Sequence, residues 1–106
     1  MTKTDREMLE NAAKAAGYSV RAVSGYEQGG TVSFYMEPSQ LYWNPLTDDG
    51  DALRLAVKLN IHVSPDSGGQ AYANSVYETI NDHASTLTAT RRAIVRAAAE
   101  IGKGMK

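Results

Sequence analysis

Alanine is the feature of this sequence that most constrains how the chain can fold. Of the 106 residues 15 are alanine, whereas leucine, isoleucine, valine and phenylalanine together number 19. Such a low content of large apolar side chains signals disorder only when the net charge is also large, and here the net charge is −1. We therefore expect an ordered domain in which alanine-faced helices lie close to their neighbours around a thin core. A thin core also makes a homodimer a candidate assembly.

Charge and cysteine content exclude several classes of function. The 11 basic and 12 acidic residues nearly balance, whereas a dedicated nucleic-acid-binding domain normally carries a basic face. The absence of cysteine excludes disulfide bonds, thiolate catalysis and cysteine-ligated zinc. No apolar run has the length or position of a signal peptide or a membrane span. We therefore expect a single cytoplasmic domain over residues 1–106, with no cofactor and with neither a membrane nor a nucleic acid as its partner.

Helical spacing of the apolar residues predicts three helices, near residues 4–16, 49–59 and 89–102. Thr4 and Glu7 have the spacing of a capping box, and Gly17 stands where a left-handed residue commonly ends a helix.

In the second segment the charged residues fall on one narrow stripe, so apolar residues cover most of its circumference. We expect this second helix to be the most buried of the three.

Three aspartates, Asp48, Asp49 and Asp51, open the second helical segment. Carboxylates so close together could bind a hard cation, but an EF-hand loop needs oxygen ligands at alternating positions and a distant glutamate, and neither is present. Carboxylates at the start of a helix also cap free backbone amides and favour the positive end of the helix dipole. We interpret the three aspartates as capping residues and expect Asn60 to end the helix.

Strands are predicted where the apolar period changes to two. Residues 18–23 and 31–37 alternate in this way on either side of Gly29 and Gly30, which is typical of a hairpin. A second, weaker pair of strands is expected at residues 61–63 and 70–80, and residues 38–49 are expected to be a connection. The predicted fold class is α+β, with the order α-β-β-α-β-β-α and a mainly antiparallel four-stranded sheet packed with three helices.

Three stretches of the chain resemble the phage ABA-sandwich domain family, whose members are small phage and prophage proteins. They are residues 43–59 (WNPLTDDGDALRLAVKL), 89–102 (ATRRAIVRAAAEIG) and 9–17 (LENAAKAAG). The resemblance implies a layered α/β sandwich with helices on both sides of a sheet, and a phage protein located in the host cell cytoplasm. It carries no catalytic residues over to this chain.

The two histidines, His62 and His83, are weak candidates for chemistry. His83 follows Asp82 and lies near Ser85, but a serine triad is assembled from residues far apart in sequence and needs an oxyanion hole. Two histidines at separate positions also lack the spacing of a metal site. We therefore expect no catalytic residue and no metal ligand.

Aromatic and basic side chains are the better candidates for a function, because tyrosine, tryptophan and arginine are enriched where proteins bind one another. Trp43 is expected to pack in the core more than at an interface. The full set of candidates for protein binding is Tyr35, Tyr77, Arg92, Arg96, Tyr42 and Trp43.

These candidates lead to an expected function. We expect a small phage accessory protein that binds a host or phage protein without catalysis. By analogy with other phage proteins, we expect that it inhibits a host defence factor. The alternatives are a virion or assembly component and a small enzyme.

Overall fold

The computed structural model describes residues 3–23, 33–37 and 41–105. Along the described chain, one group of three strands lies between the first and second helices, and a second group of three strands lies between the second and third helices. The helices are α1 (Lys3–Ala16), α2 (Asp49–Leu59) and α3 (Thr86–Lys103), with the short 3-10 helix η2 (Ile80–Asp82) before α3. The strands are β1 (Ser19–Val23), β2 (Ser33–Glu37), β3 (Leu41–Trp43), β4 (Val63–Ser64), β5 (Gln70–Ala73) and β6 (Val76–Thr79).

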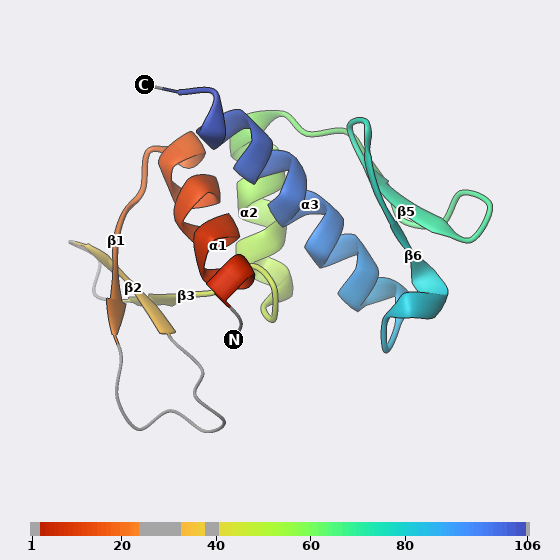
Figure 1. The fold of residues 1–106 in the computed structure, drawn as a ribbon, viewed down its shortest axis with the longest axis horizontal. Helices are drawn as coiled ribbons and strands as arrows, with labels where there is room; N and C mark the ends of the chain where they lie inside the picture. The colour runs from red at the N-terminus through yellow and green to blue at the C-terminus, as the bar shows by residue number, and fades with distance from the viewer. Residues whose placement is uncertain (1–2, 24–32, 38–40, 106) are drawn as a thin grey trace.

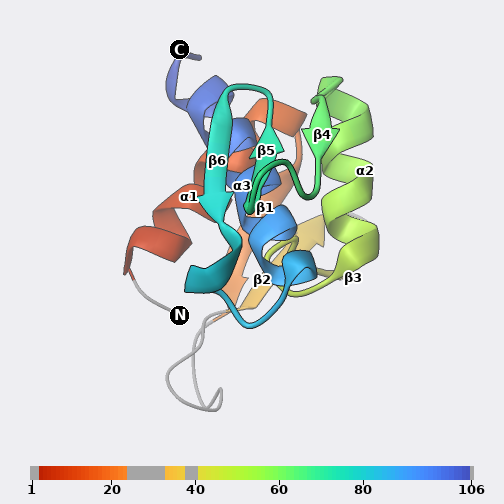
Figure 2. The same cartoon turned by 90° about the vertical axis from the view of Figure 1, so that its right-hand side faces the viewer.

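The strands form two antiparallel sheets, in the orders β1-β2-β3 and β4-β5-β6. The three helices lie between these sheets, with the first sheet at one end of the long axis of the molecule and the second sheet at the other (Figures 1 and 2). The α+β class, the three helices and the antiparallel pairing agree with the expectation from the sequence. The layers differ from those that the family resemblance implies, because here sheets flank the helices.

The expected four-stranded sheet is not found among the described residues, for two local reasons. The segment expected to be a connection contains β3, which pairs with β2. The segment 70–80 is two strands, because the chain turns at Asn74, whose φ is 55°. Asparagine tolerates this left-handed conformation better than most residues, and Asn74 is held there by a hydrogen bond from the His62 backbone N to its Oδ1 (2.9 Å). The predicted turn at Gly29 and Gly30 lies outside the described residues.

Helix α3 is the central element of the fold. It packs against α1, α2 and both long strands of the second sheet. Its buried residues are small for the most part: Ala89, Ala93, Ile94, Val95, Ala97, Ala98, Ala99 and Gly102. The approach to α1 is closest at Gly102, where an added Cβ atom would lie 1.9 Å from the backbone oxygen of Asn11. Small side chains therefore let α3 lie close to neighbours on several sides, as the alanine content predicted.

Helix α2 is less buried than the sequence suggested. It buries Ala52, Leu55 and Ala56, whereas Leu53 is 64% exposed and Val57 is 72% exposed. The expectation that this helix would be the most buried is wrong, because its neighbours cover one side of it only. An apolar circumference indicates burial on all sides only if the fold supplies neighbours on all sides.

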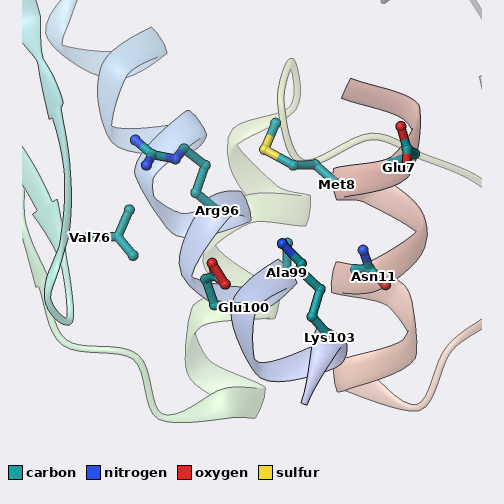
Figure 3. Close-up of a pocket in the computed structure, with 8 residues that line it drawn as sticks. All are labelled: Glu7, Met8, Asn11, Val76, Arg96, Ala99, Glu100 and Lys103. Atoms are coloured by element: carbon teal, nitrogen blue, oxygen red, sulfur yellow. The ribbon is translucent and has the colours of Figure 1, made fainter. Parts of the chain in front are cut away.

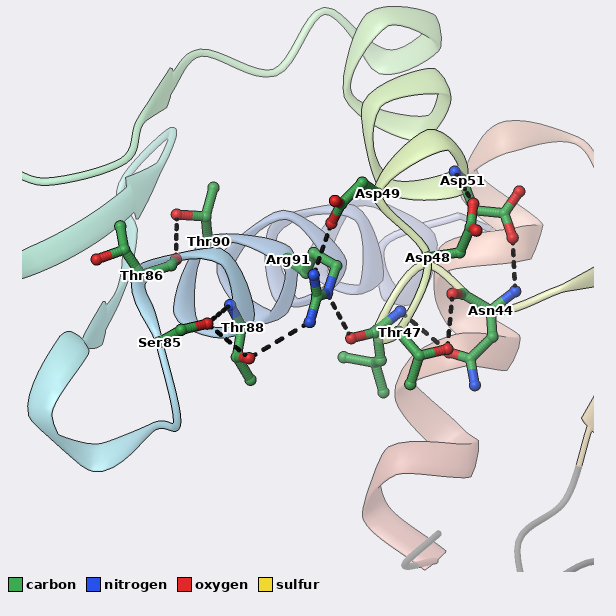
Figure 4. Close-up of polar contacts among 11 residues, drawn as sticks. Asn44, Thr47, Asp48, Asp49, Asp51, Ser85, Thr86, Thr88, Thr90 and Arg91 are labelled. Carbon is green, nitrogen blue, oxygen red and sulfur yellow. Dashed lines mark hydrogen bonds and ion pairs between the residues drawn. The ribbon is translucent and has the colours of Figure 1, made fainter.

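The ends of α2 are those expected from the sequence, and Figure 4 shows the contacts at its start. The side chain of Asp48 accepts a hydrogen bond from the backbone N of Asp51 (2.8 Å), and Asn60 ends the helix in a left-handed conformation. The Asp51 carboxylate accepts from the backbone N of Asn44 (2.9 Å), and Asp49 accepts from Arg91 of α3 (2.6 Å). The capping interpretation is therefore confirmed for Asp48, and the other two aspartates hold α2 to its surroundings.

Helix α1 ends as predicted but does not begin as predicted. Gly17 follows its last residue with a φ of 74°, which glycine adopts without the steric cost of a Cβ atom. The helix already includes Lys3, so Thr4 lies within its first turn. The capping box predicted at Thr4 is wrong, because a capping residue stands before the first helical residue.

Candidate protein-binding site

Two of the predicted binding residues, Tyr77 and Arg96, come together in the structure although 19 positions separate them. Tyr77 lies on β6 and its side chain is 49% exposed. Arg96 lies on the exposed side of α3, and its Nη1 donates a hydrogen bond to the backbone oxygen of Tyr77 (2.9 Å). Arg96 therefore contacts the backbone of β6, whereas the Tyr77 ring lies against the ring of Tyr72, with 5.8 Å between the centroids.

Two other candidates have structural partners inside the molecule. Arg92 donates from Nη2 to the Asp5 carboxylate (2.6 Å), which connects α3 to α1. Trp43 is buried, and its ring meets the ring of Tyr18 edge to face with 5.8 Å between the centroids. The packing of Trp43 in the core agrees with the expectation.

The remaining candidates lie on the first sheet. Tyr42 of β3 is 66% exposed, and the strand register pairs it with Tyr35 of β2. The Tyr35 side chain itself lies outside the described part of the structure. Because the first sheet and β6 lie at opposite ends of the helical layer (Figure 1), the six candidates do not form one surface.

A carboxylate that the sequence analysis did not select, Glu78, lies beside Arg96 and Tyr77. Its side chain is only 13% exposed. One carboxylate oxygen contacts His83 Nε2 (2.7 Å), and the other accepts a hydrogen bond from Arg96 Nη1. Glu78 is the one acidic residue between residues 70 and 80, which is the sequence signal that could have selected it.

Two opposing effects act on the pKa of Glu78. Burial raises the pKa of the carboxyl group, but the hydrogen bonds and positive charges of Arg96 and His83 outweigh burial, and the pKa is lowered from its ordinary value of 4.5. Glu78 is therefore ionised at neutral pH. Both of its oxygens are engaged, so this cluster holds β6 and the segment before α3 against the side of α3.

The polar residues around His83 do not form a catalytic triad. Ser85 is the N-cap of α3, and its Oγ accepts a hydrogen bond from the backbone N of Thr88 (3.1 Å). His83 contacts Glu78 rather than Ser85. In the described ranges, the His, Asp and Glu side chains form no group of three or more that could hold a metal ion.

A groove follows β6, and a cavity lies beside it between α1 and α3. The groove has a volume of about 410 Å³ and is lined by Ser75, Val76, Tyr77, Glu78, Thr79, Asp82 and Arg96. The cavity has a volume of about 300 Å³ and is lined by Glu7, Met8, Asn11, Val76, Arg96, Ala99, Glu100 and Lys103 (Figure 3). Val76 and Arg96 line both spaces. We call them the β6 groove and the interhelical cavity.

The charges around these two spaces are predominantly negative. Four carboxylates (Glu7, Glu78, Asp82 and Glu100) and two basic residues (Arg96 and Lys103) line them. The charge of Arg96 is balanced by Glu78, so three carboxylates and one lysine remain. This surface therefore favours a positively charged group.

Comparison with known proteins gives no relative of this chain: no protein-family model, curated protein or solved structure matches it. None of the helices in the described ranges is both long enough and apolar enough to span a membrane.

Proposed function

We propose that this protein is a small phage-encoded accessory protein that acts by binding another protein, without catalysis. The phage origin is inferred from the resemblance of three sequence stretches to the phage ABA-sandwich domain family. The observation that supports binding most strongly is that Tyr77 and Arg96 both line the β6 groove. Exposed tyrosine and arginine side chains at a concave surface are typical of the residues that contribute most to protein–protein affinity.

The polar groups at the same place support binding over catalysis. A general base works best when its pKa lies near the working pH, whereas the pKa of Glu78 is lowered from its ordinary value by its contacts with Arg96 and His83. These contacts hold the strand in place beside the groove. A rigid surface of this kind loses little conformational entropy when a partner binds.

The partner that we propose is a host or phage protein in the host cell cytoplasm. The more specific proposal is that binding inhibits a host defence factor. This step follows the analogy with small phage proteins in general. A virion or assembly component would bind proteins by the same physical means, so the identity of the bound protein separates the two roles.

The test is affinity capture from host lysate and from phage-infected host lysate, with the captured protein then purified and its affinity measured. We expect a single host protein, and a loss of affinity of at least about tenfold in Tyr77→Ala. Leu53→Ala is the control, because Leu53 is an exposed apolar residue of α2 that does not line the β6 groove. Capture of a virion protein would support the alternative role.

Two results would contradict the proposal. One is that no purified protein binds. The other is that Tyr77→Ala leaves the affinity unchanged while its thermal melt equals that of the unsubstituted protein.

A further inference from the structure

The outer edge of β6 is open among the described residues. β6 is the last strand in the order β4-β5-β6, so none of the described strands lies beside its outer edge. Figure 2 shows this edge on the side of the second sheet that is nearer to α1. A strand edge presents backbone N–H and C=O groups that can pair with another extended chain.

The strand register identifies which backbone groups point outward. A two-residue turn joins Ala73 to Val76, so this pair closes the turn with hydrogen bonds and the bonded pairs then alternate. Ile80 N donates to Gly69 O (3.0 Å), which continues the same alternation. Tyr77 and Thr79 therefore direct their backbone groups away from β5. The hydrogen bond from Arg96 to the Tyr77 oxygen agrees with this direction.

The same alternation places side chains on the two faces of β6. Glu78 contacts Arg96 of α3, and Val76 packs against the core, so these two residues face the helices. A strand added to the open edge would also direct every second side chain toward the helices. Those side chains would approach the interhelical cavity, where Glu7 and Glu100 lie on opposite helices (Figure 3). Arg96 and Lys103 line the same cavity, and because Arg96 pairs with Glu78, one carboxylate there remains in excess of Lys103.

We propose that the open edge of β6 binds an extended, positively charged segment of a partner protein as an additional strand. A lysine or arginine of that segment enters the interhelical cavity between Glu7 and Glu100. This inference rests on the proposed protein-binding function and specifies its site and the chemistry of the partner. Strand addition draws affinity from backbone hydrogen bonds and specificity from pockets for alternate side chains.

Charge favours this partner over a second copy of the chain. Two copies joined through β6 would bring the carboxylates of one groove close to the same carboxylates of the other, and like charges at an interface are unfavourable. A basic segment instead compensates the excess of carboxylates. The hydrogen bond from Arg96 does not block the edge, because a carbonyl oxygen has a second lone pair for an incoming N–H.

The first experiment uses short end-capped peptides that alternate valine with lysine, glutamate or glutamine. Binding is followed by the amide NMR shifts of the protein as each peptide is added up to about 1 mM. We expect the lysine peptide to shift Tyr77 and Thr79 and to bind at least about tenfold more tightly than the glutamate peptide. A lysine peptide with N-methylated backbone amides keeps its charge but loses its donors, so we expect it not to bind.

Several outcomes overturn strand addition. They are the absence of shifts at β6 with the lysine peptide, equal binding of the lysine and glutamate peptides, and undiminished binding of the N-methylated peptide. Sedimentation of the unliganded protein as a dimer that Tyr77→Ala dissociates would assign the edge to a second copy and also overturns the proposal.

A second experiment tests the cavity. We expect Glu7→Gln with Glu100→Gln to weaken binding of the lysine peptide by about tenfold. Glu10→Gln is the matched control, because Glu10 lies on α1 and pairs with Arg6 outside the cavity. Equal weakening in the control variant would show a general charge effect and would overturn the assignment of the cavity.

The two proposals fail in different ways. If the captured protein partner depends on Tyr77 but not on Glu7 and Glu100, and β6 amides do not respond to the lysine peptide, protein binding stands and strand addition fails. If the lysine peptide binds as expected but no protein partner exists, the proposed function fails.

Discussion

Helices α2 and α3 have similar apolar patterns but very different surroundings. α3 packs against two helices and a sheet, and most of its buried residues are alanine or glycine. α2 carries larger apolar residues, yet it leaves Leu53 and Val57 exposed on one side. The comparison shows that the number of neighbouring elements decides how deeply a helix is buried, and that alanine permits several neighbours to approach at once.

The ion pairs of the arginines also differ between the two helices: those of α3 reach other elements, whereas that of α2 stays within its own helix. The arginines of α3 connect it to α1, to the start of α2 and to the second sheet, through Asp5, Asp49 and Glu78 respectively. In α2, Arg54 contacts Asp51 and Asp48 at the start of its own helix. The central helix is therefore tied to its neighbours by charge as well as by packing.

The largest effect that we expect is in α2, between the buried Leu55 and the exposed Leu53. Leu55→Ala should lower the free energy of unfolding by about 2–5 kcal/mol, because it leaves a cavity at a fully buried position. Leu53→Ala should change it by no more than about 0.5 kcal/mol. Leu59→Ala should fall between them, since Leu59 is half-buried. Urea unfolding followed by circular dichroism measures all three, and equal effects of Leu55 and Leu53 would show that α2 is not covered on one side only.

The next largest loss of stability is expected at Gly102, where α3 approaches α1 most closely. Gly102→Ala should cost about 1–3 kcal/mol, because its new methyl group meets the backbone of Asn11 and the helices must move apart. Gly104→Ala is the matched control, since the nearest atom to an added Cβ there is 3.6 Å away. A Gly102→Ala variant as stable as Gly104→Ala would mean that close helix packing is not what makes α3 central.

Smaller effects are expected at the two N-caps. Asp48→Ala and Ser85→Ala should each cost about 1 kcal/mol, because each side chain accepts a hydrogen bond from a backbone amide in the first turn. Asp48→Asn should retain most of the stability, since asparagine caps equally well. Millimolar Ca²⁺ should leave the Tm of the unsubstituted protein unchanged. A clear rise in Tm with Ca²⁺ would contradict the interpretation of the aspartates as caps.

The sequence was sufficient to predict three helix ends, but the start of α3 was expected at residue 89 and lies at Thr86, after the N-cap Ser85. The bounds of α2 follow from Asp48 and Asn60, and the end of α1 follows from Gly17. The separation into two sheets was not predictable in the same way, because strand pairing depends on partners that the pattern does not specify. The turn at Asn74 was missed because it contains no glycine, and its left-handed position is taken by asparagine, which also tolerates that conformation.

The candidate site was predicted only in part, for a related reason. Tyr77 and Arg96 were selected as exposed residue types suited to binding, and the structure places them together. Their contact, and the contacts of Glu78 with His83 and Arg96, connect elements far apart along the chain. A single sequence contains no signal for such contacts, so the role of Arg92 in pairing with Asp5 was not predictable either.

The smallest effect that we expect is a change in pH dependence at the sheet side of α3. The pKa of Glu78 is lowered in the folded protein, so the unfolded chain takes up a proton near pH 4.5 before the folded protein does. The stability that Glu78 contributes is therefore complete above pH 4.5 and is lost as the pH falls below it.

The effect is small because Arg96 is well exposed and its ion pair is screened by water. We expect the unfolding free energy of Glu78→Gln to fall less steeply between about pH 5 and pH 3 than that of the unsubstituted protein. If the variant follows the unsubstituted protein, Glu78 does not fasten the second sheet to α3, and the packing of small residues alone accounts for the central position of that helix.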